Sequence, residues 1–380
     1  MRLALLLASL TVVLAGAVSA QGASSTKRPW LWQCEQIGLE DAKDRCYVRM
    51  LLLDIEASGD PADELPRIDL RARATGTSLL GRCHMLMHQV GRRYAVEHHV
   101  TLENLQRYVP RSNDPGCSAG FGMGLVMALG PEIIRTAGRS AVATCLRLPT
   151  RYRSYTCIHS LGHALMRGYH ETLWLAVNAC RKLGQRVAPD CVQGAFHDYW
   201  ISLRGADETT QPAQIIRSPR VLCGQYFSFA RQCWYRYFVE QAPGPVIASA
   251  SDLRRVCRGL RLMQRSGCIA GASLDLQDDP FEQTGICSSL ATADLLSCLR
   301  GVGVQALAGK PRQELELVAR CGRLRAAARW GCYEWYGLTL DVVTNGRFRT
   351  RGCLKLRDAE ARAGCLAGAR RSRGALVTFS

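Results

Sequence analysis

Two short segments of the sequence carry histidines at the spacing that lets one helix face hold a metal ion. Residues 84–94 read HMLMHQVGRRY and residues 159–169 read HSLGHALMRGY, so both follow the pattern H-x-L-x-H-x-[VL]-x-R-x-Y. Histidines four residues apart lie on the same face of a helix, about 5–6 Å apart at Cβ. Imidazole nitrogens suit copper, zinc and iron. Two such helices facing each other would bring together His84, His88, His159 and His163.

A fifth histidine belongs to the same internal duplication. The segment CSAGFGM that starts at Cys117 corresponds to CVQGAFH that starts at Cys191, so Met123 stands where the second copy has His197. We therefore expect His197 to join the four histidines as a ligand, with His170 or Met123 as further candidates.

Two interpretations of these histidines stay open at this stage. One is a metal or other chemical site. The other is structural, because a histidine at a hairpin contact can donate from one ring nitrogen and accept at the other, and its packing can respond to pH. Leu86, Val90, Leu161 and Leu165 indicate that both helices also pack against neighbours.

Other catalytic patterns do not fit. Neither histidine pair is H-E-x-x-H, and neither G-x-S-x-G nor a P-loop occurs in the sequence. The glycine cluster GFGMG at 120–124 is expected to allow close helix packing. His197 and Asp198 are neighbours in the sequence, and adjacent residues on a helix point in different directions, so we do not expect them to form a dyad.

The elements that must position the histidines are predicted by the cysteines. The chain has 380 residues, of which 47% are hydrophobic and 18 are cysteine. Eight neighbouring couples are 10 to 12 residues apart, and the remaining two cysteines, 34 apart, pair by exclusion. The predicted disulfides are Cys34–Cys46, Cys83–Cys117, Cys145–Cys157, Cys180–Cys191, Cys223–Cys233, Cys257–Cys268, Cys287–Cys298, Cys321–Cys332 and Cys353–Cys365.

The couples recur with a period near 34 residues, which is the length of a two-helix repeat. The first cysteine ends an apolar run, as in AVNAC, and the second often opens C-x-x-G, as in CVQG. We predict an all-α fold of helical hairpins, each closed by a disulfide that contributes roughly 2–3 kcal/mol. Because one hairpin cannot bury its apolar faces, the hairpins must stack into a solenoid. A cysteine metal cluster would need C-x-x-C pairs, which are missing.

Cysteine couples that recur in this way, as in AVNAC…CVQG and LRRVC…CIAG, resemble the secreted cysteine-rich Sel1-like repeat proteins. The resemblance extends from Cys145 to Cys365 and implies a disulfide-stapled α/α solenoid that acts as an interaction module. That family has tighter couples and a glycine-rich hairpin signature that this sequence lacks. The resemblance therefore implies a fold and assigns a role to no residue.

The first 20 residues have the pattern of a signal peptide, with Arg2, an apolar run and V-S-A before Gln21. We expect cleavage near Ala20 and an exported, periplasmic or secreted protein without a transmembrane span. Residues 21–75 are predicted as an N-terminal helical hairpin followed by the linker SGDPADELPRID. Duplicated repeats with all eight histidines follow at 76–225, arginine-rich stapled repeats at 226–368, and a flexible tail at 369–380.

The formal net charge is +17, and residues 251–380 contribute +9 of it. This charge either lies on a solvated face or attracts an anionic partner. Our first hypothesis is a binding scaffold for a protein, a peptide or an anionic envelope component, with no nucleic acid expected and with undetermined oligomeric state. The second is a metalloprotein, a redox or hydrolytic enzyme, that uses the five histidines.

The scaffold hypothesis has one candidate anchor, an aromatic-rich stretch around the Cys223–Cys233 hairpin. The alternative for this stretch is that it forms the core of that hairpin. Its members are Tyr226, Phe227, Phe229, Trp234, Tyr235, Tyr237 and Phe238.

Overall fold

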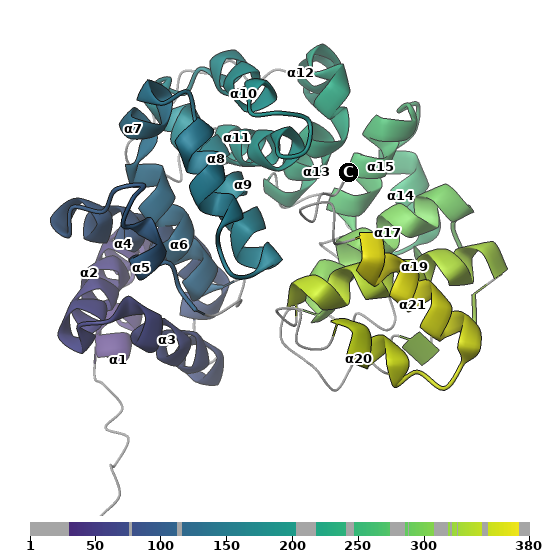
Figure 1. Ribbon diagram of the computed structural model, residues 1–380, viewed down its shortest axis with the longest axis horizontal. Coiled ribbons are helices and arrows are strands. Elements are labelled where there is room, and N and C mark those ends of the chain that lie inside the picture. Colours follow the sequence, from purple (N-terminus) through teal and green to yellow (C-terminus); the bar gives the residue numbers. More distant parts are fainter. Residues whose placement is uncertain are drawn as a thin grey trace, which may run out of the picture. The chain divides into compact units, whose positions relative to one another are not determined.

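In the computed structural model, residues 30–75, 78–111, 116–202, 218–240, 247–273, 286–287, 289–307, 318–319, 321–324, 326–343 and 349–371 are described. Within these ranges the chain is all-α, as predicted (Figure 1). It forms two compact units, residues 1–50 and 51–380. The predicted signal peptide lies outside the described residues.

The first helices are α1 (Trp30–Glu35) and α2 (Glu40–Ser58), which the Cys34–Cys46 disulfide joins. The segment predicted as a linker is instead the helix α3 (Pro61–Thr75), so that prediction was wrong. The side chain of Asp60 accepts a hydrogen bond of 2.8 Å from the Ala62 backbone N–H, and Pro61 occupies the first turn, where its missing N–H costs nothing. The helix then continues through Pro66.

The described part of the second unit is helical. The bounds of its helices after α3 are α4 (Ser78–Glu97), α5 (Leu105–Tyr108), α6 (Cys117–Ala128), α7 (Gly130–Arg135), α8 (Arg139–Leu146), α9 (Arg151–Gly168), α10 (Leu173–Lys182), α11 (Ala188–Ser202), α12 (Pro219–Gln225), the 3-10 helix η1 (Phe227–Phe229), α13 (Ala230–Glu240), α14 (Ala250–Val256), α15 (Leu262–Ala272), α17 (Thr292–Leu307), α19 (Ala326–Val343), α20 (Arg349–Leu354) and α21 (Ala359–Arg371). Residues 369–371, predicted as tail, therefore end a helix, and residues 372–380 lie outside the described part.

The disulfides of the structure coincide with the nine pairs deduced from the cysteine spacing. Their Cα atoms are 5.0 to 5.8 Å apart, within the range that a disulfide requires. All 18 cysteines are paired and none is free. Such disulfide usage is typical of proteins that fold in an oxidising compartment.

One row of packed helices begins at α4 and, from α6 onward, consists of the helices that carry the second cysteine of each couple. In chain order, α4 packs on α6, α6 on α9, α9 on α11, α11 on α13, α13 on α15, α15 on α17, α17 on α19 and α19 on α21 (Figure 1). The shorter helices α8, α10, α12 and α20 pack on the helices that follow them. This is the stacking expected of an all-α repeat solenoid, in which each repeat buries its apolar face against the next.

The glycine of C-x-x-G is the residue that lets neighbouring helices of the row approach. A Cβ at Gly120 would overlap the carbonyl oxygen of His84, and a Cβ at Gly194 would overlap that of His159. Gly124, in the GFGMG cluster, meets the carbonyl of His88 in the same way. The cluster therefore serves close packing, as predicted, and the packing lies directly beside the histidines.

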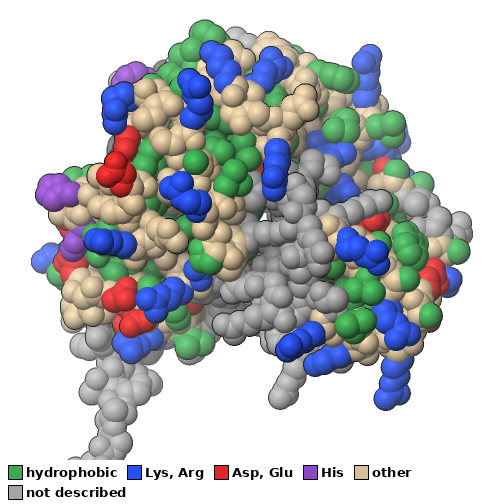
Figure 2. All heavy atoms as spheres, in the orientation of Figure 1, with side chains coloured by type: hydrophobic (Ala, Val, Ile, Leu, Met, Phe, Trp, Pro, Cys, Tyr) green, Lys and Arg blue, Asp and Glu red, His purple; other side chains and the backbone are tan. Residues whose placement is uncertain are grey.

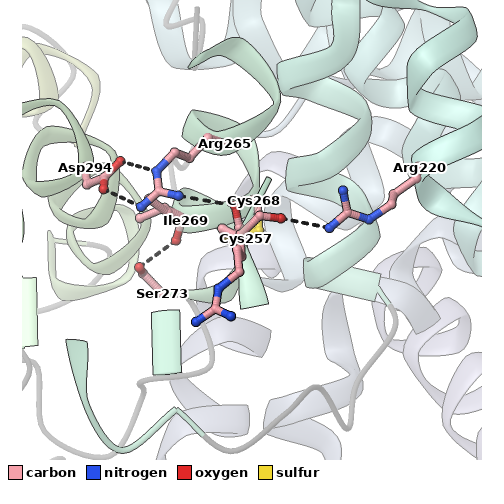
Figure 3. The surroundings of a disulfide bond; sticks show 8 residues. Arg220, Cys257, Arg265, Cys268, Ile269, Ser273 and Asp294 are labelled. Atoms are coloured by element: carbon pink, nitrogen blue, oxygen red, sulfur yellow. Dashed lines mark hydrogen bonds and ion pairs between the residues drawn. A yellow bond between two sulfur atoms is a disulfide. The ribbon is translucent and has the colours of Figure 1, made fainter. Parts of the chain in front are cut away.

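Several arginines of the later repeats bond from one repeat to the next. Around the Cys257–Cys268 disulfide, Arg265 donates to both oxygens of Asp294 at 2.9 and 2.7 Å, and Arg220 donates to the carbonyl of Arg258 at 2.8 Å (Figure 3). Arg329 pairs with Glu360 at 2.7 Å. Part of the arginine content thus stabilises the stacking of the repeats.

On the face that Figure 2 shows, Lys and Arg side chains are spread widely, with Asp and Glu among them. The predicted aromatic anchor is mostly core. Phe229, Trp234, Tyr235 and Phe238 are buried, and Phe227 is 59% exposed. Among the described residues, no helix combines the length and apolar character needed to span a membrane.

Candidate metal centre

Three histidines of adjacent helices converge on one point inside the row. His159 and His163 come from α9, and His197 comes from α11. The Nε2 atom of His163 lies 3.3 Å from Nε2 of His159 and 3.1 Å from Nδ1 of His197. These three nitrogens form a triangle, and its third side, from His159 Nε2 to His197 Nδ1, is 3.1 Å long. The rings are buried, with exposed fractions of 0%, 0% and 5%.

The size of this triangle matches the coordination sphere of a transition metal. Imidazole nitrogens bind zinc at about 2.0–2.1 Å, and tetrahedral geometry then sets neighbouring nitrogens roughly 3.3 Å apart. The three observed edges are 3.1 to 3.3 Å long. An ion at the centre would therefore bind all three nitrogens with little movement of the side chains.

Two of the three rings contact a carboxylate through the ring nitrogen that faces away from the centre. Nδ1 of His163 lies 3.0 Å from Asp198, and Nε2 of His197 lies 3.0 Å from Glu240. Because a carboxylate only accepts, each of these nitrogens carries the proton, and the nitrogen on the other side of the ring presents its lone pair to the centre. Carboxylates in this position are a regular feature of histidine metal sites, where they orient the ring.

The third ring receives a hydrogen bond at the nitrogen that faces the centre. A terminal nitrogen of Arg236 lies 3.3 Å from Nε2 of His159. Since a guanidinium only donates, this Nε2 is also a lone-pair nitrogen, and the proton of His159 is on Nδ1, which has no hydrogen-bond partner among the described residues. Arg236 also pairs with Glu240 at 3.2 Å. Arg167 lies 3.7 Å from Asp198.

A second histidine pair adjoins the three-histidine cluster. His84 and His88 of α4 have their Nε2 atoms 3.2 Å apart. The ring of His88 faces the cluster, with its centroid 5.5 Å from that of His163 and 6.5 Å from that of His197. His88 is buried, whereas His84 is partly exposed. The duplicated helices thus bring all five predicted histidines into one region.

The buried rings are held in the form that binds metals. Burial lowers the pKa of His88, His159 and His197 well below the ordinary histidine value. The neighbouring Arg236 lowers the pKa of the last two further. Burial also lowers the pKa of His163, against the opposing effect of its hydrogen bond with Asp198. At neutral pH these rings are neutral imidazoles, the protonation state required of a ligand.

The packing of the row explains how residues distant in the sequence meet here. Helices α9, α11 and α13 are consecutive in the row, so their inner faces present His159, His197 and Glu240 to one another. The glycine of each duplicated C-x-x-G packs on the carbonyl of the first histidine of its pair. These close glycine–carbonyl contacts between neighbouring helices therefore set the separation between the helices that carry the ligands.

Some candidates from the sequence lie elsewhere, and two contributors were missed. His170 is exposed in the turn after α9, with φ of 50°, and Met123 is buried in α6. His197 and Asp198 form no dyad, as expected, because Asp198 bonds His163 instead. Arg236 and Glu240 lie beyond residue 225, in the repeats predicted to be scaffold only. Their spacing of four residues on α13 is a common helix pair, and no sequence pattern ties it to the histidines.

No protein family, no curated protein and no solved structure matches this chain. The resemblance to Sel1-like repeat proteins therefore extends only to a helical, cysteine-rich repeat architecture. The geometry of the histidine cluster is the basis for a functional assignment.

Proposed function

We propose that this protein binds a divalent transition-metal ion at His159, His163 and His197. One observation carries the proposal: three ring nitrogens lie 3.1 to 3.3 Å from one another, and the hydrogen bonds of the rings to Asp198, Glu240 and Arg236 assign a lone pair to each of the three. Lone pairs at this distance repel each other, and a hydrogen-bonded structural cluster would instead place an N–H between each pair. A cation at the centre turns the repulsion into three bonds.

The ligand set selects the class of ion. Three neutral imidazoles without thiolates suit zinc or copper, and iron less well, since the cysteines are all in disulfides. The carboxylates of Asp198 and Glu240 increase the basicity of the rings that they contact. Such a centre leaves a fourth coordination position for an exogenous ligand, as catalytic zinc sites do.

The pair His84 and His88 supplies an outer site in this proposal. Its nitrogens are 3.2 Å apart, which fits two ligands of one ion, and His84 reaches partly to the surface. The His84/His88 pair thus adjoins the inner cluster on its more exposed side. With only two protein ligands, the outer site binds more weakly than the inner one.

The disulfides favour a role outside the cytoplasm, so the expected metal source is the periplasm or the extracellular medium. The binding-scaffold hypothesis stays a prediction. Its aromatic anchor lies mostly in the core, and the described residues favour no particular partner.

The proposal is tested by metal titration of protein purified without a histidine tag. Calorimetry with Zn²⁺ should give one tight and one weaker ion per chain. H163A should lose the tight ion, the double variant H84A/H88A should lose only the weaker one, and H170A, which removes an exposed histidine, should behave as wild type. Wild-type protein that binds no Zn²⁺ or Cu²⁺ would refute the proposed function.

A further inference from the structure

Two guanidinium groups lie beside the three-histidine cluster and its carboxylates. Asp198, which contacts His163, lies 3.7 Å from the guanidinium of Arg167. Glu240, which contacts His197, lies 3.2 Å from the guanidinium of Arg236. A divalent ion would add two positive charges to a buried site in which each of these carboxylates already pairs with a guanidinium. Buried charge without compensation is costly, so the ion requires an anion beside it.

Arg236 shows where that anion would lie. Its terminal nitrogen donates to Nε2 of His159, which is the same lone pair that the ion needs. Once the ion binds Nε2, this N–H loses its acceptor. The side chain of Arg236 is only 12% exposed, and its Nε has no hydrogen-bond partner among the described residues. The guanidinium would then face the fourth coordination position with unsatisfied donors.

We propose that a small oxyanion completes the coordination of the ion and is held by the guanidinium of Arg236. This inference rests on the proposed function. A planar guanidinium offers parallel N–H donors that match the oxygens of carboxylate, carbonate or phosphate. One oxygen binds the ion and another accepts from Arg236, so a single anion compensates the added charge and replaces the lost acceptor.

Arg236 is fixed in the position that this role requires. Its other terminal nitrogen is held by Glu240 at 3.2 Å, and the guanidinium carbon lies 5.5 Å from the centre of the Tyr235 ring. Glu240 in turn contacts His197. The anion-binding group and a metal ligand are thus positioned by the same carboxylate. A chain of contacts from Arg236 through Glu240 to His197 couples occupancy of the two positions.

The test uses full-length protein loaded with Co²⁺, whose visible absorption reports changes in coordination. Bicarbonate, phosphate and acetate are titrated separately, with chloride as the anion without oxygen. At least one oxyanion should change the spectrum with saturation, and R236Q should raise its Kd at least tenfold. R236K, which keeps the charge but loses the planar fork, should lie between them. R265Q, which breaks the ion pair between Arg265 of α15 and Asp294 of α17, removes no contact of the cluster and is the matched control, so it should behave as wild type.

The outcomes separate the two proposals. Protein that takes up Co²⁺ but shows no saturable response to any of the three oxyanions overturns the oxyanion site and leaves the metal centre standing. An equal response in wild type and R236Q overturns the role of Arg236. Wild-type protein that takes up no Co²⁺ overturns both. Circular dichroism of each variant verifies folding, and R236K provides the comparison if R236Q does not fold.

Discussion

Gly194 packs against the carbonyl oxygen of His159 so closely that no side chain fits between them. The two residues belong to consecutive helices of the row, α11 and α9. This contact sets the distance between the helix that carries His197 and the helix that carries His159 and His163. A residue without polar side-chain atoms thus controls the geometry of a polar site.

Replacement of Gly194 should therefore affect stability and metal binding together. G194A forces α9 and α11 apart, which should cost about 1–3 kcal/mol in the free energy of unfolding. It should also weaken Zn²⁺ binding, because the 3.1 Å separation of His159 and His197 cannot be kept. Urea denaturation and a metal titration measure the two effects. G224A is the control, since a Cβ at Gly224 meets no atom within 4 Å. A G194A protein with wild-type stability would contradict this account of the packing.

Asp198 should set metal affinity without binding the ion itself. The D198N variant loses the carboxylate that accepts from His163, so the ring is less basic and less firmly oriented. We expect Zn²⁺ affinity to fall about 10–100-fold with the stoichiometry unchanged. Competition with a chromophoric chelator measures the affinity. D294N is the control, because Asp294 also pairs with an arginine but lies in the later repeats. It should leave Zn²⁺ affinity unchanged. Equal affinities of D198N and wild type would show that this contact is structural only.

Asp190 should make the protein less stable at neutral pH than in mild acid. The residue is 1% exposed, and among the described residues neither carboxylate oxygen has a hydrogen-bond partner. Burial raises its pKa well above the ordinary value for aspartate. As pH rises above about 3.9, the unfolded chain releases this proton while the folded chain retains it. Folding stability therefore falls with rising pH until the folded pKa is reached, by about 1.4 kcal/mol for each pH unit.

The D190N variant isolates this effect, because its amide cannot ionise. D190N should match wild type near pH 3 and exceed its stability at pH 7, as measured by thermal unfolding across that range. D63N, which alters an exposed aspartate in the first turn of α3, should show no such divergence. A constant difference between D190N and wild type at all pH values would mean that folding does not change the pKa of Asp190.

Much of the fold could be predicted from local patterns. The cysteines of a couple are 10 to 12 residues apart because a short connection joins the end of one helix to the start of the next, and that geometry permits few other pairings. The histidine pairs were equally visible, because a spacing of four residues defines one helix face. The linker prediction failed because Pro61 and Pro66 suggested a break, whereas Asp60 caps a helix that begins at the first proline and tolerates the second.

The sequence by itself determined the disulfide pairs, the all-α repeats and the five histidines, because each depends on spacing within one or two neighbouring helices. Only the tertiary structure decided which of these histidines converge and what surrounds them. His159 meets His197, His163 meets Asp198, and Arg236 and Glu240 reach the cluster from α13. The reason is physical: these contacts depend on how consecutive helices of the row pack, which is set by the close approach of glycines to backbone carbonyls. The periodicity of residues within a single helix does not predict that packing.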